Sequence, residues 1–165
     1  MKIAVQFSHE KYPDELLQES ITDILSQHTT LSLATTGDTS YINTAHYGFN
    51  EKLELFILTN PETQHGKNAA VNPSVAVAIW TEPEKWGTNL QGLQLFGSYS
   101  EVQPKDLPEA MAAFAERIPA FSDTFKTPND ILAGINRLFR IKVESLKLLD
   151  EPRFGRRNYI VLNLM

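Results

Sequence analysis

The hydrophobic residues of the chain recur every three or four positions near the N-terminus and every second position farther along. The helical spacing follows a Pro-Asp-Glu start and predicts an amphipathic helix over residues 13–27. The alternating spacing between turn residues predicts strands at 31–35, 41–49, 53–59, 75–80, 92–102, 138–149 and 159–164. Further helices are predicted from Pro61 to about Val71, from Pro104 to Ile118, and from Pro128 to about Asn136.

One predicted strand carries apolar residues on both of its faces. Leu55 and Ile57 lie on one side of segment 53–59, while Phe56 and Leu58 lie on the other. A strand covered on both sides favours a barrel wall over an open sheet. Because short turns join the early strands, we expect antiparallel pairing, and a small barrel would remove exposed sheet edges. The pattern therefore predicts an α+β protein dominated by a barrel of six or seven strands.

Segment 75–80 has an unusual division between its faces. Val75, Val77 and Ile79 point to one side, whereas the other side carries Ala76 and Ala78. Small side chains leave room for a neighbour to approach closely. We expect a packed helix over these alanines, with a ligand ring as the alternative.

Composition narrows the choice of function. A length of 165 residues suits a single domain over 1–165, and the net charge of −5 argues against a dedicated nucleic-acid binder. The chain has no cysteine, which excludes disulfides and thiolate catalysis. It has no apolar run long enough to cross a bilayer, and its N-terminus does not resemble a signal peptide. We expect a soluble cytoplasmic protein with no membrane partner.

The most informative segment joins the strand at 53–59 to the helix that begins at Pro61. A helix N-terminus offers free backbone N–H groups and a favourable dipole for an anion such as phosphate. Side-chain donors gather at the same place: Thr59, Thr63, Gln64, His65 and Lys67. A capped helix with a solvated polar face is the simpler interpretation of the same residues.

Several short motifs accompany this junction. They are His28-Thr29-Thr30-Leu31, Thr63-Gln64-His65, Gly92-Leu93-Gln94-Leu95-Phe96-Gly97 and Phe154-Gly155-Arg156-Arg157. With Leu58–His65 and the later Asn72-Pro73, they make most of the chain resemble the pyridoxamine 5′-phosphate oxidase-related superfamily of flavin-binding split barrels. The resemblance implies a six-stranded antiparallel split barrel with peripheral helices, a homodimer, and FMN bound between the subunits.

The resemblance also implies positions for the FMN. The superfamily's phosphate-binding Ser-Arg-Lys falls on Thr63, Gln64 and His65, and the residues beside the flavin ring fall on Asn43, Thr44, Ala45, His46, Leu58 and Thr59. A neutral amide and a partly charged histidine here replace two cations, so we expect reduced FMN affinity. Lys67, or Arg156 and Arg157 of the other subunit, could restore the charge. Gln94 would either bond a flavin edge or point outward.

Other residues admit two interpretations. His46 is either a hydrogen-bonded residue of the barrel wall or a proton donor. Trp80 and Trp86 could each stack on a ring system, with a place in the core as the alternative for Trp80. Arg153, Arg156 and Arg157 form either an anion clamp or a solvated turn. The four histidines lack metal-ligand spacing, so no metal site is predicted. Haem remains an alternative cofactor, because a distant relative of this fold holds haem through histidine.

The expected function is that of an FMN-dependent oxidoreductase acting on a small molecule. The flavin would supply the chemistry, and no catalytic acid, base or nucleophile stands out in the sequence. The C-terminus lacks the Trp and Arg-x-Asn-Pro pattern of the true oxidase, which argues against pyridoxamine phosphate oxidation. A non-catalytic flavin carrier, sensor or stress-related protein is the alternative, as is a barrel without cofactor.

Overall fold

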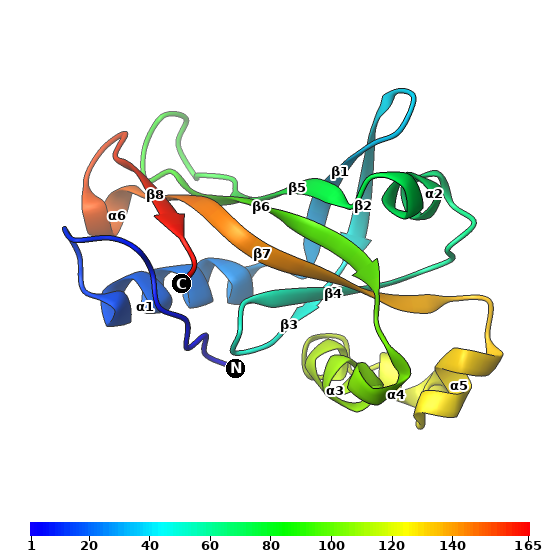
Figure 1. Ribbon diagram of the computed structural model, residues 1–165. Helices are drawn as coiled ribbons and strands as arrows, with labels where there is room; N and C mark the ends of the chain where they lie inside the picture. Colours follow the sequence, from blue (N-terminus) through cyan, green and yellow to red (C-terminus); the bar gives the residue numbers. More distant parts are fainter.

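The computed structural model describes residues 1–165 and shows one curled antiparallel sheet with helices around it (Figure 1). The strands are β1 (Thr30–Thr36), β2 (Ser40–His46), β3 (Gly48–Phe49), β4 (Glu54–Thr59), β5 (Ser74–Thr81), β6 (Gln91–Glu101), β7 (Arg137–Asp150) and β8 (Tyr159–Asn163). The helices are α1 (Asp14–Gln27), α2 (Gln64–Val71), α3 (Leu107–Arg117), α4 (Phe121–Thr124), α5 (Pro128–Ala133) and α6 (Glu151–Phe154), with a 3₁₀ turn η1 (Pro104–Asp106). None of the helices has both the length and the apolar character needed to span a membrane.

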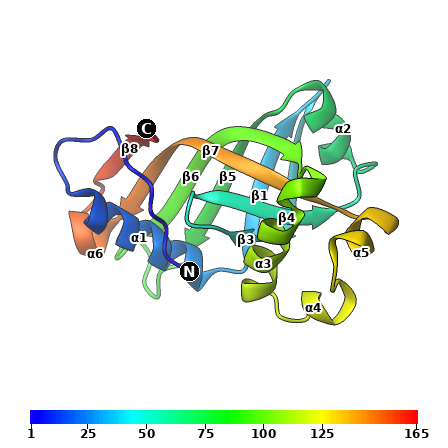
Figure 2. The same ribbon diagram turned by 60° about the horizontal axis from the view of Figure 1, so that its bottom comes forward.

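The strand order explains why the barrel stays split. Neighbouring strands run β2-β1-β5-β6-β7-β4-β3, and β8 pairs with β7 outside this path. All pairs are antiparallel. The sheet curls until β2 approaches β4 without pairing with it (Figure 2). A slot between these two strands therefore interrupts the barrel wall.

The prediction of six strands is wrong, because the sheet has eight. Segment 41–49, expected as one strand, divides at Tyr47: β2 pairs with β1, and β3 pairs with β4. The Tyr47 side chain is fully buried and its hydroxyl donates to the backbone oxygen of Leu25 at 2.8 Å. This contact with α1 holds the chain where it changes neighbours. The last strand, β8, adds to the outside of the path along β7.

The barrel interior is a single apolar cluster. The predicted alternation places Leu33, Val77, Leu95 and Ile141 inside, each at most 2% exposed. Helix α1 closes one end of the barrel, and its predicted apolar face is buried at Leu17, Ile21, Ile24 and Leu25. The expectations for α1 and for the alternating strands are confirmed.

A second cluster lies on the outside of β4. Leu55 and Ile57 belong to the interior cluster, whereas Phe56 packs outward with Leu107 and Phe114 of α3. Both faces of β4 are therefore covered, as predicted. Helices α3, α4 and α5 gather on this side of the sheet, below β4 and β7 (Figure 1).

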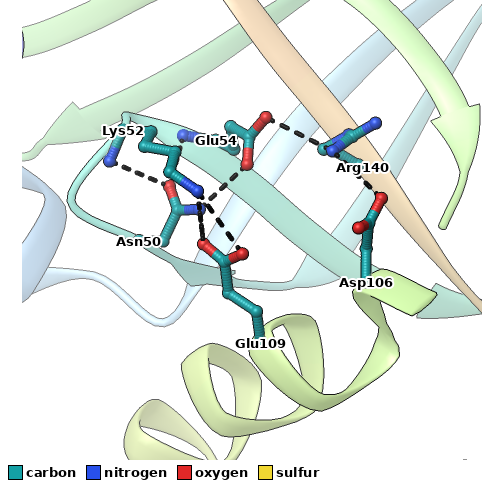
Figure 3. A network of polar contacts seen from close by, with 6 residues as sticks. All are labelled: Asn50, Lys52, Glu54, Asp106, Glu109 and Arg140. Atoms are coloured by element: carbon teal, nitrogen blue, oxygen red, sulfur yellow. Dashed lines mark hydrogen bonds and ion pairs between the residues drawn. The ribbon is translucent and has the colours of Figure 1, made fainter. Parts of the chain in front are cut away.

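Polar contacts fix the first turn of α3 against the β3–β4 turn (Figure 3). Asn50 is 3% exposed, and its amide donates to Glu54 and to Glu109, both at 2.9 Å. Arg140 of β7 forms ion pairs with Glu54 at 3.4 Å and with Asp106 at 3.8 Å. This network holds α3 in place, and the opposite end of that helix lines the groove described below.

The expectation of a helix over Ala76 and Ala78 is wrong. Ala78 is exposed and Ala76 half-buried, because the helices pack at β4 and at the barrel ends instead. Cross-strand neighbours extend the alanine face in both directions. We call this surface the outer face and define it by Ala34, Ile42, Ala76, Ala78 and Phe96. Ile42 is 68% exposed on it, so the outer face presents apolar atoms to water.

Candidate functional site

A groove of about 560 Å³ lies where the slot between β2 and β4 meets the start of α2. Its first side comes from β2, its second from the end of β4 and the start of α2, and its third from the α3–α4 region. The lining residues are Asn43, Thr44, Ala45, His46, Leu58, Thr59, Thr63, His65, Phe114, Ile118, Ala120, Phe121 and Phe125. Pockets of this size commonly hold small molecules or cofactors.

Most of the predicted cofactor-binding residues line this one groove. They come from two separate stretches of the chain and are Asn43, Thr44, Ala45, His46, Leu58, Thr59, Thr63 and His65. The other predicted residues, Gln64, Lys67, Gln94, Arg156 and Arg157, lie outside it. The fold therefore assembles the strand and junction parts of the predicted site.

The β2 side of the groove is the edge of the sheet. Strand β2 pairs only with β1, so alternate backbone N–H and C=O groups of Asn43–His46 have no partner strand. Such an edge can bond the polar rim of a planar ligand.

The helical side is apolar and was missed by the sequence interpretation. It brings Phe114, Ile118, Phe121 and Phe125 to the groove, with Phe114 and Phe121 rings 5.0 Å apart. An aromatic wall opposite a polar strand edge suits a flat heteroaromatic ring. Nothing in the local pattern of residues 114–125 indicates which strand they pack against, so only the tertiary structure shows this wall.

The start of α2 offers unpaired backbone donors. Thr63 is the N-cap residue in extended conformation, and the N–H groups of Gln64, His65 and Gly66 donate to no other group of the chain. A side chain at Gly66 would place its Cβ 2.2 Å from the backbone oxygen of Pro61, so glycine is needed for this close packing. Free amides at a helix N-terminus favour an anion.

His65 is buried at this junction and held by two threonines. It is 4% exposed, with Nε2 at 2.8 Å from Oγ1 of Thr59 and 3.1 Å from Oγ1 of Thr63. Burial lowers the pKa of His65, so the ring is neutral at neutral pH. The position where the superfamily carries lysine therefore supplies no positive charge.

The hydrogen bonds identify the tautomer of His65. The Thr63 hydroxyl donates to the backbone oxygen of Asn60 at 2.7 Å, so toward His65 it can only accept. Nε2 consequently carries the hydrogen, and Nδ1, which has no partner, carries the lone pair. Thr59 then accepts from His65 and keeps its own hydroxyl hydrogen for a ligand in the groove.

Two of the predicted donors point away from the groove. The Gln64 amide donates to Asn68 at 2.8 Å, and Asn68 in turn donates to Thr35 at 3.1 Å. Lys67 lies 3.6 Å from Glu62 in an exposed ion pair. No lysine or arginine lines the groove. An anion bound there would depend on backbone amides and hydroxyls.

His46 is the exposed histidine of the groove. Its Nδ1 lies 3.2 Å from the backbone oxygen of Thr29 and donates to it, because a carbonyl can only accept. Nε2 is left with a free lone pair. His46 can therefore accept a proton, or bind a metal centre, from the groove.

Gln94, Arg156 and Arg157 are too far around the molecule to join the groove of their own chain. Gln94 is exposed beside Ala78, at the outer face, and both arginines line a different pocket. Their predicted contact with flavin requires a second subunit and stays a prediction.

Comparison with solved structures identifies the fold. The fold matches a haem-binding protein of Mycobacterium smegmatis (TM-score 0.71, 15% identity, 93% of this chain and 60% of that one). It also matches a proposed pyridoxamine 5′-phosphate oxidase of Listeria innocua (0.61, 20%, 81% and 98%) and an FAD-binding protein of Mesorhizobium loti (0.60, 19%, 76% and 87%). The chain has the split-barrel fold of the pyridoxamine 5′-phosphate oxidase-like superfamily.

Sequence comparison gives the narrower family. No protein-family model matches the chain. It is 32% identical over 111 residues to the UPF0306 protein YE0465 of Yersinia enterocolitica, covering 65% of this chain and 72% of that protein. The chain belongs to the UPF0306 family.

Proposed function

We propose that this protein binds FMN in the groove between β2 and α2. One observation carries the proposal: a strand edge, an aromatic wall and two residues at the start of α2, Thr63 and His65, line the same groove of about 560 Å³. The Mesorhizobium loti neighbour, which binds a flavin, supports it by analogy of fold.

The residues present fit such a group. The N–H groups of Gln64, His65 and Gly66, with the Thr59 hydroxyl, would hold the phosphate. The edge of β2 would hold the polar rim of the ring, opposite Phe121. Bound flavin supplies hydride or single-electron transfer, and the chain's own residues orient it and exclude water.

The absence of a cation sets the expected strength of binding. Charge-assisted hydrogen bonds are about twice as strong as neutral ones, and here the phosphate would meet only neutral donors. FMN should bind more weakly than in a site with Arg and Lys, and its advantage over riboflavin should be correspondingly smaller.

We also propose that two copies of the chain associate through the outer face. This surface is apolar, and Gln94 lies beside it. A second copy packed there would cover Ile42, Ala78 and Phe96 and could bring its Gln94 toward the groove. The homodimer predicted from the sequence would account for this exposed apolar sheet.

The activity we propose is flavin-dependent oxidation or reduction of a small molecule. His46 would accept or return a proton, because its Nε2 is free and it lines the groove. A non-catalytic flavin carrier is the rival, and the neutral phosphate site favours it. Bleaching of the bound flavin by NADPH without air, followed by recovery of its colour when air is admitted, would distinguish the enzyme from the carrier.

A variant that fills the groove tests whether FMN binds there. Ala120→Trp adds a large side chain at the exposed helical rim of the groove, and Ala112→Trp adds the same side chain to α3 outside it. FMN titration followed by flavin fluorescence should show saturable binding for the native protein and A112W, and none for A120W. Equal binding by all three proteins would place the flavin elsewhere.

Haem is a second candidate because of His46. Histidines that bind a metal usually donate their other ring N–H to a carbonyl or carboxylate, and His46 has this arrangement with Thr29. Neighbours of the fold include a haem-binding protein and the haem storage protein HutZ of Vibrio cholerae. Haem titration should give a histidine-type Soret band that His46→Ala abolishes; an unchanged band in H46A would dismiss this candidate.

A further inference from the structure

A second pocket, of about 420 Å³, lies between the β5–β6 loop and the turn after α6. It shares no residue with the groove. Its lining residues are Trp80, Glu82, Pro83, Trp86, Gly87, Leu90, Glu151, Arg156 and Arg157. The proposed FMN site makes no use of this combination of two tryptophans and two arginines.

Glu151 holds the two walls of the pocket together. Its carboxylate accepts from the backbone N–H of Arg157 at 2.9 Å and from that of Leu90 at 3.1 Å. Its own backbone N–H donates to the oxygen of Leu90 at 3.0 Å. These bonds to Arg157 and Leu90 lower the pKa of Glu151. The two loops are thus fixed to each other, and the Glu151 carboxylate is occupied by backbone donors.

The aromatic surface of the pocket faces water. The ring of Trp80 lies against Gly92, where a side chain would place its Cβ 2.4 Å from a ring carbon, and Trp80 is 49% exposed. Trp86 is 95% exposed at the loop tip. Stacking of a flat ring on these side chains would remove apolar area from water.

The charge of the pocket is positive on its α6 side. Arg156 and Arg157 are exposed, and neither guanidinium forms an ion pair or hydrogen bond. Glu82, on the opposite loop, is the other charged group that lines the pocket without a partner. Because guanidinium groups bind phosphate and carboxylate in bidentate fashion, an anionic group would sit beside the arginines.

We infer that this pocket is a binding site for a planar aromatic anion: one or two fused rings carrying a phosphate or carboxylate. The ring would stack on Trp86 and Trp80, and the anionic group would bind Arg156 and Arg157. This site does not depend on flavin in the groove, and it gives the two arginines a role within their own chain.

The two tryptophans report on this pocket alone, because they are the only ones in the chain. We would follow the indole N–H signals of the ¹⁵N-labelled full chain during titration with naphthyl phosphate. Both signals should move saturably. Inorganic phosphate should move them little, and naphthol, which lacks the charge, should bind at least about tenfold more weakly.

Variants test separately what the arginines and Trp86 contribute to binding in this pocket. The double variant R156Q/R157Q should weaken naphthyl phosphate at least about tenfold, whereas Lys105→Gln, on η1, should leave it unchanged. Trp86→Ala should also weaken it while the backbone spectrum shows an intact fold. Indole signals that stay still, or equal affinity in R156Q/R157Q, would overturn the inference.

FMN affinity gives the remaining test. R156Q/R157Q should leave the FMN titration of the groove unchanged. If the double variant loses FMN instead, the arginines serve the flavin of a partner subunit and the second site is refuted. If the native chain binds naphthyl phosphate but no FMN, the second site stands and the proposed function fails.

Discussion

Nε2 of His65 lies 2.8 Å from Oγ1 of Thr59, joining the first buried turn of α2 to the end of β4. This contact places a neutral ring at the position that the sequence resemblance aligns with the lysine of the phosphate-binding motif. It also leaves the Thr59 hydroxyl hydrogen free toward the groove. A single pair of residues thus sets both the position and the polarity of the proposed phosphate site.

Thr59 gives the first prediction. Thr59→Val removes the free hydroxyl and should weaken FMN binding about fivefold, since one hydrogen bond contributes about 1 kcal/mol. Thr59→Ser, which keeps the hydroxyl, should bind like the native protein. Flavin fluorescence titration measures both. Equal affinities for T59V and T59S would remove Thr59 from the site.

Acid should destabilise the fold through His65 and His28. Burial lowers the pKa of both residues, and Arg117 adds to the effect at His28. As pH falls, these histidines therefore bind protons in the unfolded chain at a higher pH than in the folded chain. The free energy of unfolding is constant above the ordinary histidine pKa of about 6.5 and falls as pH drops below it. Urea unfolding between pH 7.5 and 5 should show this slope, and His65→Gln should reduce it. A slope unchanged in H65Q would contradict the neutral, buried state.

Asp150 should be a major structural residue. It is fully buried and accepts from Ser20 at 2.6 Å, from Gln91 at 2.9 Å and from Arg153 at 3.0 Å. Asp150→Asn removes the buried charge opposite Arg153, which keeps Asp23 and Glu19 as partners, and should cost about 1.5–3 kcal/mol in the free energy of unfolding. The exposed control Asp123→Asn should cost about 0.5 kcal/mol or less. A D150N chain as stable as D123N would contradict this reading of the network.

The outer face gives a prediction about assembly. Ala78→Glu places a charge in the centre of that apolar surface, and Ala112→Glu places it on an exposed part of α3. Light scattering should give a dimer for the native chain and A112E, and a monomer for A78E. A dimeric A78E chain would mean that the copies associate through another surface.

The spacing of apolar residues along the chain predicted much of the fold. The bounds of α1 and β7 fall within about one residue of those predicted, because their apolar spacing decides the buried face by itself. The division of residues 40–49 could not be predicted in this way. It depends on the Tyr47 contact with Leu25, and a strand pattern does not reveal a distant hydrogen bond.

The candidate site was predictable on two of its three sides. The resemblance placed Asn43–His46, Leu58, Thr59, Thr63 and His65, which the fold brings to one groove. The aromatic side came from residues 114–125, whose packing depends on the network around Asn50 and Glu109 that holds α3. The orientation of Gln64 toward Asn68 likewise follows from tertiary contacts and not from the motif.

The start of α2 gives the most direct measurement. Amide signals of the ¹⁵N-labelled protein should be compared during titration with FMN and with riboflavin. FMN should shift the amides of Gln64, His65 and Gly66 together with those of Asn43–His46 on β2, and riboflavin should shift only the β2 set. Movement of neither set by FMN, or of amides remote from the groove alone, would contradict a phosphate held by this helix start.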